Sequence, residues 1–202
     1  MSKHSSTSQA LQPLHFPLWG SRLIEASAGT GKTWTIAALY LRLVLGHGVD
    51  KSFSRPLMPP DILVMTFTRA ATRELSDRIR ARLIEAVQCF RGEAEPAAHD
   101  SFLRDLRDAY AEGAQRDTAA WRLDMAAQCM DDAAIHTIDA WCQRMLREHA
   151  FDSGNLFDET LEADESQRQT EAAQDYWRQQ CYPLSGEVLE VALGVWPDVH
   201  AL

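Results

Sequence analysis

One segment, residues 22–46, constrains the fold of this chain more than any other. The pattern predicts a short apolar strand at residues 22–26, then the loop Ser-Ala-Gly-Thr-Gly-Lys-Thr at residues 27–33, then an apolar helix that stops at a glycine. Gly29 and Gly31 have no Cβ, so the loop backbone can adopt positive φ and turn its N–H groups inward. Strand, glycine loop and helix in this order predict a phosphate-binding loop.

The other residue types of the loop suit a nucleotide polyphosphate. Lys32 carries a flexible positive charge that can reach the β- and γ-phosphates, and the Thr33 hydroxyl can complete the shell of a Mg²⁺ ion. The first N–H groups of the following helix and its positive dipole end would face the same anion. The loop departs from the usual pattern at its first position, where Ala26 replaces glycine. We predict Lys32 and Thr33 as the catalytic residues and Thr33 as the metal ligand.

Composition bounds the class of protein. The chain has 202 residues and a net charge of −9, which argues against a small, wholly basic nucleic-acid binder but permits a local basic surface, because screening acts over about 8 Å. Its four cysteines are widely spaced without a Cys-x-x-Cys pair, so we expect reduced thiols in a cytosolic compartment. No apolar run approaches the length of a membrane span, so no membrane partner is expected.

Two further strands and a long helix are predicted downstream. Residues 61–67 form a continuous apolar run, which is typical of a parallel strand covered on both faces and would complete a right-handed βαβ unit with the first strand. A helix to about Phe90 should follow, and residues 133–138 predict a third strand. The apolar face of that long helix would consist of Leu75, Ile79, Leu83 and Ala86.

The end of the second predicted strand is a candidate phosphate-contacting surface. Ligands bind outside the carboxyl ends of strands in open α/β sheets, and residues 66–69, Thr-Phe-Thr-Arg, lie there. Hydroxyls and helix N-terminal N–H groups suit the phosphates of a nucleic acid. Five arginines stand between residues 69 and 82 against two acids. For three of them a solvated helix face with i,i+4 pairs is the preferred interpretation, namely for Arg78, Arg80 and Arg82.

Asp139, directly after the third predicted strand, has two interpretations. It could hold Mg²⁺ as a carboxylate at the end of a strand, or it could cap the helix that follows. We favour the cap, because the strand is only weakly apolar and no second acid follows.

Three segments together resemble motifs I, Ia and Ib of the UvrD-like superfamily 1 helicases, namely residues 25–33, 66–75 and 137–146. The resemblance implies an α/β fold, a P-loop NTPase of the RecA-like type, whose parallel sheet carries a large α-helical insertion. It implies ATP with Mg²⁺ as cofactors, bound by Ala26, Ser27, Ala28, Gly29, Thr30, Gly31, Lys32 and Thr33. It also implies single-stranded DNA contacts by Thr66, Phe67, Thr68 and Arg69 from motif Ia and by Thr137 and Trp141 from motif Ib.

Three positions depart from the family pattern. Trp19 stands where the family has an adenine-reading glutamine, and its indole could stack on a purine instead. Asp139 replaces the histidine of motif Ib, and Trp141 replaces the phenylalanine that follows it. A carboxylate beside a DNA phosphate is unfavourable, which again favours a capping role for Asp139.

The resemblance also organises the chain. Residues 14–91 and 133–150 would form the RecA-like ATP-binding domain, residues 92–132 a helical excursion, and residues 151–202 a helical start of an accessory subdomain, after a disordered lead-in at residues 1–13. We find no Asp-Glu Walker B strand, arginine finger, second RecA-like domain or nuclease domain. The chain is therefore expected to be an N-terminal fragment that is inactive alone, since phosphoryl transfer would lose large stabilising contributions.

Within the family, the likeness is to the helicase–nuclease subunits of exodeoxyribonuclease V enzymes. It implies ATP-dependent DNA unwinding in double-strand-break repair and recombination, in the bacterial cytoplasm. The implied partners are DNA, as single-stranded track and duplex end, and RecC-like and RecD-like subunits of a heterotrimer. Two alternatives stay open: a standalone P-loop NTPase or kinase with Asp139 on Mg²⁺, and a non-catalytic P-loop module that binds a protein. The second would use tryptophan anchors, although core packing explains Trp121, Trp141, Trp177 and Trp196 more simply.

Overall fold

The computed structural model describes residues 11–27, 29–48, 53, 55–153 and 164–199. These residues belong to two compact units, residues 1–145 and residues 146–202, and each is described by itself. The predicted lead-in at residues 1–13 lies mostly outside the described residues. The predicted domain boundaries stay predictions.

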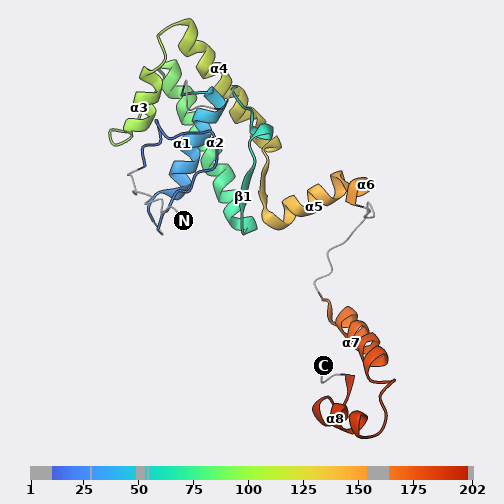
Figure 1. The fold of residues 1–202 in the computed structure, drawn as a ribbon. Helices are drawn as coiled ribbons and strands as arrows, with labels where there is room; N and C mark the ends of the chain where they lie inside the picture. Colours follow the sequence, from blue (N-terminus) through green and yellow to red (C-terminus); the bar gives the residue numbers. More distant parts are fainter. Residues whose placement is uncertain (1–10, 28, 49–52, 54, 154–163, 200–202) are drawn as a thin grey trace. The chain divides into compact units, whose positions relative to one another are not determined.

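The first unit is built mainly from helices. Its four long helices are α1 (Lys32–Leu45), α2 (Arg69–Arg91), α3 (Ser101–Asp108) and α4 (Ala114–Gln128), with short 3₁₀ turns η1 (Pro59–Asp61) and η2 (Cys129–Asp132) (Figure 1). Helix α2 packs on both α1 and α4, so the core lies among these three helices.

The apolar pattern of the long helix is confirmed. The four side chains predicted to share one face of α2 are all buried: Leu75, Ile79, Leu83 and Ala86. The predicted end of α1 is confirmed as well, because Gly46 follows it in the left-handed conformation with φ of 64° and its N–H bonds to carbonyls of the last turn.

The sheet consists of two parallel strands in the described residues. Strand β1 (Val64–Thr66) pairs with β2 (Ile135–Thr137), and the register places Thr66 opposite Thr137. The prediction of a strand covered on both faces is wrong for β1, because alternate side chains are exposed and Phe67, just beyond it, is 87% exposed. Helices cover only one face of this strand.

The predicted strand at residues 22–26 is not formed. The segment is irregular and exposed, with Leu23 at 83%. A strand is stable only when its backbone groups pair with a neighbouring strand, and no described segment pairs with this one. The predicted βαβ unit of strand, glycine loop, α1 and second strand is therefore absent from the described structure.

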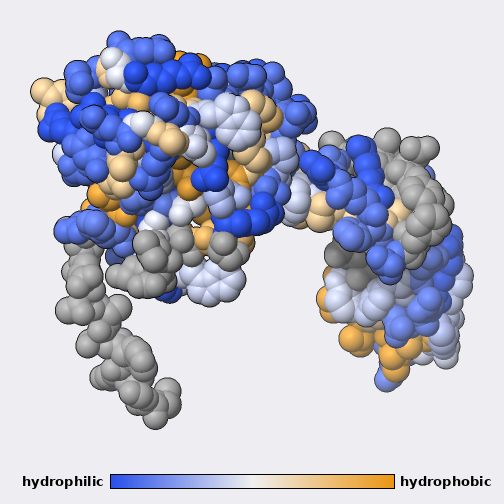
Figure 2. All heavy atoms as spheres, turned by 90° about the horizontal axis from the view of Figure 1, so that it is seen from above, coloured by the Kyte–Doolittle hydropathy of each residue, from blue (hydrophilic) through white to orange (hydrophobic). Residues whose placement is uncertain are grey.

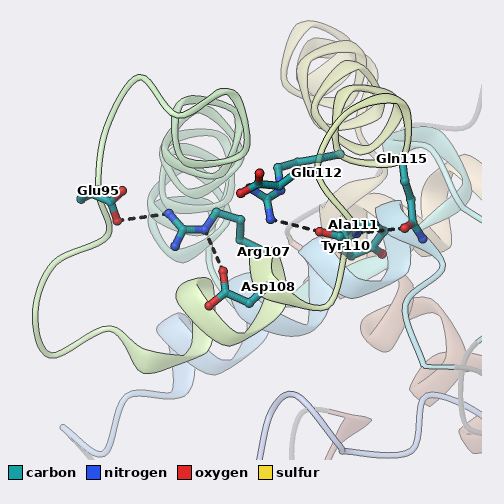
Figure 3. A network of polar contacts seen from close by, with 8 residues as sticks. Glu95, Arg107, Asp108, Tyr110, Ala111, Glu112 and Gln115 are labelled. Carbon is teal, nitrogen blue, oxygen red and sulfur yellow. Dashed lines mark hydrogen bonds and ion pairs between the residues drawn. The ribbon is translucent and has the colours of Figure 1, made fainter.

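The helical excursion between β1 and β2 is held by a surface network of polar contacts (Figure 3). The Arg107 guanidinium of α3 donates to Asp108 at 3.0 Å and to Glu95 in the preceding loop at 3.1 Å. Arg116 of α4 donates to the Tyr110 carbonyl at 3.1 Å. Helices α3 and α4 both lie within residues 92–132, the segment for which the sequence predicts helical structure.

The second unit contains α6 (Ala150–Ser153), α7 (Ser166–Gln180) and α8 (Glu187–Val195), while α5 (Ile138–Glu148) runs across the boundary between the two units. Figure 2 shows apolar residues gathered at one end of the second unit. The exposed valines of α8 are Val188, Val191 and Val195. Within the described ranges, no helix combines the length and apolar character needed to cross a membrane.

Candidate functional site

The glycine loop has the backbone conformation that its sequence predicts. Gly29 and Gly31 adopt φ of 77° and 83°, a region that side-chain-bearing residues avoid. Open space surrounds the position of a Cβ at both residues, so backbone strain and not crowding selects glycine here. Ala28 lies outside the described residues.

Helix α1 begins at the end of this loop without a side-chain cap. Gly31 is its N-cap residue and no acid stands in its first turn. The first N–H groups of a helix have no intrahelical acceptor, and with the helix dipole they place partial positive charge at the loop. Lys32 and Thr33 are the first two residues of α1, so their backbone N–H groups and side chains lie at this anion-binding end.

The Lys32 side chain folds back over the loop. Its ammonium group donates to the Ser27 carbonyl at 2.6 Å and to the Ala26 carbonyl at 3.3 Å. The Thr30 hydroxyl donates to the same Ser27 carbonyl at 2.8 Å. These contacts bring four of the predicted nucleotide-binding residues, Ala26, Ser27, Thr30 and Lys32, into one compact turn around the N-terminus of α1.

Trp19 lies upstream of the loop and is 63% exposed, with its ring 5.6 Å from that of Phe53. Much of the indole is therefore accessible. Sequence analysis missed the residue that anchors this upstream segment, Arg42 of α1, which is fully buried and donates to the carbonyls of Pro13 and Phe16 at 2.6 and 2.7 Å. The sequence does hold a signal for this role, because Arg42 is a charged residue on the buried face of an otherwise apolar helix. Burial lowers the pKa of this guanidinium.

The structure brings Thr66 and Thr137 together at the carboxyl edge of the sheet, where both strands end. The Thr66 hydroxyl lies 2.6 Å from the Thr72 hydroxyl and donates to the Thr68 carbonyl at 3.2 Å. Thr68 caps α2, since its hydroxyl accepts from the Ala71 N–H at 3.1 Å. Of the predicted motif Ia contacts, Phe67, Thr68 and Arg69 are exposed and Thr66 is half-buried.

Thr137 is only 9% exposed, and its hydroxyl accepts from the Ala140 N–H at 3.2 Å. The threonine therefore caps α5, and the prediction that Asp139 is the cap is wrong. The helix starts at Ile138, directly after the strand, which places Asp139 inside its first turn, where the dipole still favours a carboxylate. Trp141, also on α5, stacks on His136, with 5.8 Å between the ring centroids.

The described residues contain no cluster of three side chains suited to binding a metal ion.

The arginines of α2 do not all lie on a solvated face. Arg80 pairs with Asp131 at 2.5 Å near the surface, but Arg82 is buried, which contradicts its predicted exposure. The Arg82 guanidinium bonds to Asp100 and, at 2.7 Å, to Glu85. Burial alone would lower the pKa of Arg82, yet the two carboxylates outweigh it and raise the pKa. Burial would likewise raise the pKa of Asp100, and the Arg82 hydrogen bond and charge hold it below its usual value instead.

Comparison with known proteins identifies the family. The model of the UvrD/REP helicase N-terminal domain matches residues 6–190. This chain belongs to the UvrD/REP helicase family. The resemblance predicted from motifs I, Ia and Ib is thus confirmed.

This UvrD/REP helicase chain is similar to subunits named RecB of the RecBCD enzyme. It is 47% identical over 199 residues to that of Escherichia coli K12, which covers 98% of the chain, and 44% identical over 178 residues, or 88% of the chain, to that of Haemophilus influenzae Rd. The Mycobacterium tuberculosis H37Rv subunit is 32% identical over 183 residues, 87% of the chain. The chain spans 16%, 15% and 16% of the length of these relatives.

Proposed function

We propose that this chain is the N-terminal ATP-binding portion of a RecB-like, ATP-dependent DNA helicase and exonuclease subunit. The observation that carries the proposal is the glycine loop: two positive-φ glycines lead directly into a helix whose N-terminus has no side-chain cap, in a chain of the UvrD/REP helicase family. The fold would be the first RecA-like P-loop domain of the motor. Membership of this family also favours a helicase over a standalone kinase or a non-catalytic module.

In this proposal the loop and the sheet edge have separate tasks. Backbone N–H groups of residues 26–33 would bind the triphosphate of ATP, Lys32 would exchange the loop carbonyls for the β- and γ-phosphates, and the Thr33 hydroxyl would hold Mg²⁺. Bound Mg²⁺ would neutralise charge that develops on the transferred phosphoryl group. Trp19 would stack on the base with its exposed face.

Single-stranded DNA would bind at the carboxyl edge of the sheet. Phe67 offers an exposed ring for base stacking, and Arg69 offers a guanidinium for phosphate at the start of α2. The threonine hydroxyls already form hydrogen bonds within the turns at the ends of the strands. The main role of Thr66, Thr68 and Thr137 would therefore be to hold these turns in position, and not to contact DNA. Trp141 would add a second aromatic surface on α5.

The biological setting follows from the named relatives. We infer that the complete polypeptide assembles with RecC-like and RecD-like subunits in the bacterial cytoplasm and acts on duplex ends in double-strand-break repair and recombination. We expect residues 1–202 alone to bind nucleotide weakly and to lack unwinding activity, because a catalytic acid for Mg²⁺ and a charge-neutralising arginine finger would come from elsewhere in the polypeptide.

The test is ATP-dependent unwinding of an end-labelled duplex by the assembled complete enzyme, together with binding of a fluorescent ATP analogue. Lys32→Ala should abolish unwinding and weaken analogue binding at least tenfold, because the β- and γ-phosphates lose their point charge. Arg55→Ala is the control, since this exposed arginine bonds to Asp61 at 3.2 Å and to the Pro56 carbonyl at 3.4 Å, away from the loop in sequence, and should leave both readouts unchanged. Equal unwinding by Lys32→Ala and wild type would exclude the proposal.

A further inference from the structure

A buried ionic cluster connects three helices of the first unit. The Arg82 side chain of α2 is 8% exposed and that of Asp100, the N-cap of α3, is 6% exposed. Asp100 bonds to Arg82 through one oxygen and accepts from the Leu103 N–H at 3.2 Å through the other. One carboxylate therefore neutralises the arginine of α2 and caps α3 at the same time.

The Arg82 guanidinium also contacts two aromatic rings. It lies 5.7 Å from the ring centroid of Trp34 and 5.8 Å from that of Phe102, and the two rings meet edge to face at 5.7 Å. Its Nε and Nη2 atoms are buried and have no hydrogen-bond acceptor among the described residues. These N–H groups therefore depend on the ring faces for compensation, and a planar guanidinium is suited to such stacking where an ammonium is not.

The cluster joins the helix that follows the nucleotide loop to the helix that begins at the proposed DNA-binding edge of the sheet. Trp34 follows Thr33 directly, so its ring is attached to the first turn of α1, which also carries Lys32. Arg82 stands thirteen residues after Arg69, where α2 begins at the sheet edge. At 1.5 Å per residue this is about 20 Å along one continuous helix.

We propose that Arg82 is a positioning residue that couples nucleotide binding at the loop to DNA binding at the sheet edge, through Trp34 on one side and α2 on the other. The proposal rests on the proposed function. A shift of the first turn of α1 on nucleotide binding would press the Trp34 ring against the guanidinium, which lies 5.7 Å from it. Because Asp100 and Phe102 fix the other sides of that guanidinium, the displacement passes to α2 and reaches Thr68 and Arg69.

The double variant Arg82→Met/Asp100→Asn tests this coupling without leaving a buried charge. Methionine keeps an apolar stem against the rings, and asparagine caps a helix about as well as aspartate. Trp34→Leu is a second variant, which removes the ring and keeps the ion pair. The matched control is Arg91→Met/Asp124→Asn, because that pair joins α2 to α4 at 2.7 Å, is partly exposed and does not touch α1.

The measurement is the dissociation constant of a fluorescent ATP analogue for the complete enzyme, with and without a 20-nucleotide oligothymidylate. We expect DNA to change this constant at least about fivefold in the wild type and the control, a usual size for coupling between sites. Both cluster variants should show a change below about twofold, while their analogue affinity without DNA stays within about threefold of the wild type. Circular dichroism verifies that each variant is folded.

Two outcomes would overturn the inference: cluster variants that keep the wild-type ratio, or a wild type whose analogue affinity does not respond to DNA. Neither outcome removes the proposed function, which is decided by Lys32→Ala. If Lys32→Ala bound the analogue and unwound DNA as the wild type does, the nucleotide site itself would be misassigned and the coupling with it. Should the double variant fail to fold, Trp34→Leu alone decides between the outcomes.

Discussion

The ion pair between Arg82 and Asp100 makes a sharp prediction about stability. Replacing Arg82 with methionine leaves the Asp100 carboxylate buried with a single N–H donor, that of Leu103. Removing one partner of a buried pair costs about 3–5 kcal/mol, because the remaining charge is uncompensated. The Asp100→Asn variant should lose less, about 1.5–3 kcal/mol, since Glu85 still neutralises Arg82 at 2.7 Å.

The double variant should recover most of the stability. With neither charge buried, Arg82→Met/Asp100→Asn should lie within about 1 kcal/mol of the wild type, since an apolar replacement of a buried pair is often neutral. Glu85 is half-exposed and can be solvated once its partner is removed. The two substitutions should therefore be strongly non-additive, with an interaction energy of at least about 2 kcal/mol.

Urea denaturation of the chain, followed by circular dichroism, measures the effect. With a slope of about 2 kcal/mol per molar urea, a loss of 4 kcal/mol moves the midpoint down by about 2 M. The partly exposed pair of Arg91 and Asp124 is the control, and its single and double variants should add within about 0.5 kcal/mol. A double cluster variant as unstable as the sum of its singles would refute the reasoning.

Three further predictions concern caps, backbone and acid. Thr68→Ala should cost about 1 kcal/mol in the same assay by removing the cap of α2, whereas Thr118→Ala, within α4, should cost nothing. Gly46→Ala should destabilise by about 1 kcal/mol or more, because φ is +64° and a Cβ would lie 3.1 Å from a proline ring, while Gly194→Ala in α8 should be neutral or stabilising. The folded-state pKa of Asp100 lies below 3.8, so the unfolded chain binds more protons in acid, and stability should fall as pH drops below that value. Asp100→Asn should show a shallower loss in urea titrations at several pH values.

The features that depend on local sequence were predictable. The loop glycines have the positive φ that their position requires, and the buried face of α2 follows helical spacing, because both properties are decided within a few residues. The order of motifs was enough to identify the family. The roles of the predicted site residues stay predictions.

The features that depend on distant partners were not predictable. Residues 22–26 have the composition of a strand, but hydrogen bonding to a neighbouring strand decides whether one forms. Arg82 resembles its exposed neighbours in sequence, and its buried partner Asp100 stands eighteen positions away, where sequence spacing does not reveal it. The weakly apolar strand and the absence of a second acid favour Asp139 as a cap, but the helix begins at Ile138 and its cap is Thr137.

The register of the two strands has an electrostatic consequence. Because Thr66 lies opposite Thr137, the two strands end at the same edge of the sheet, and α2 begins there at Arg69 and α5 at Ile138. Each N-terminus contributes about half a positive charge. Asp139 in the first turn of α5 offsets the charge of that end, whereas the first turn of α2 holds no acid and begins with Arg69, so in a chain with a net charge of −9 the positive charge of this edge lies at the start of α2.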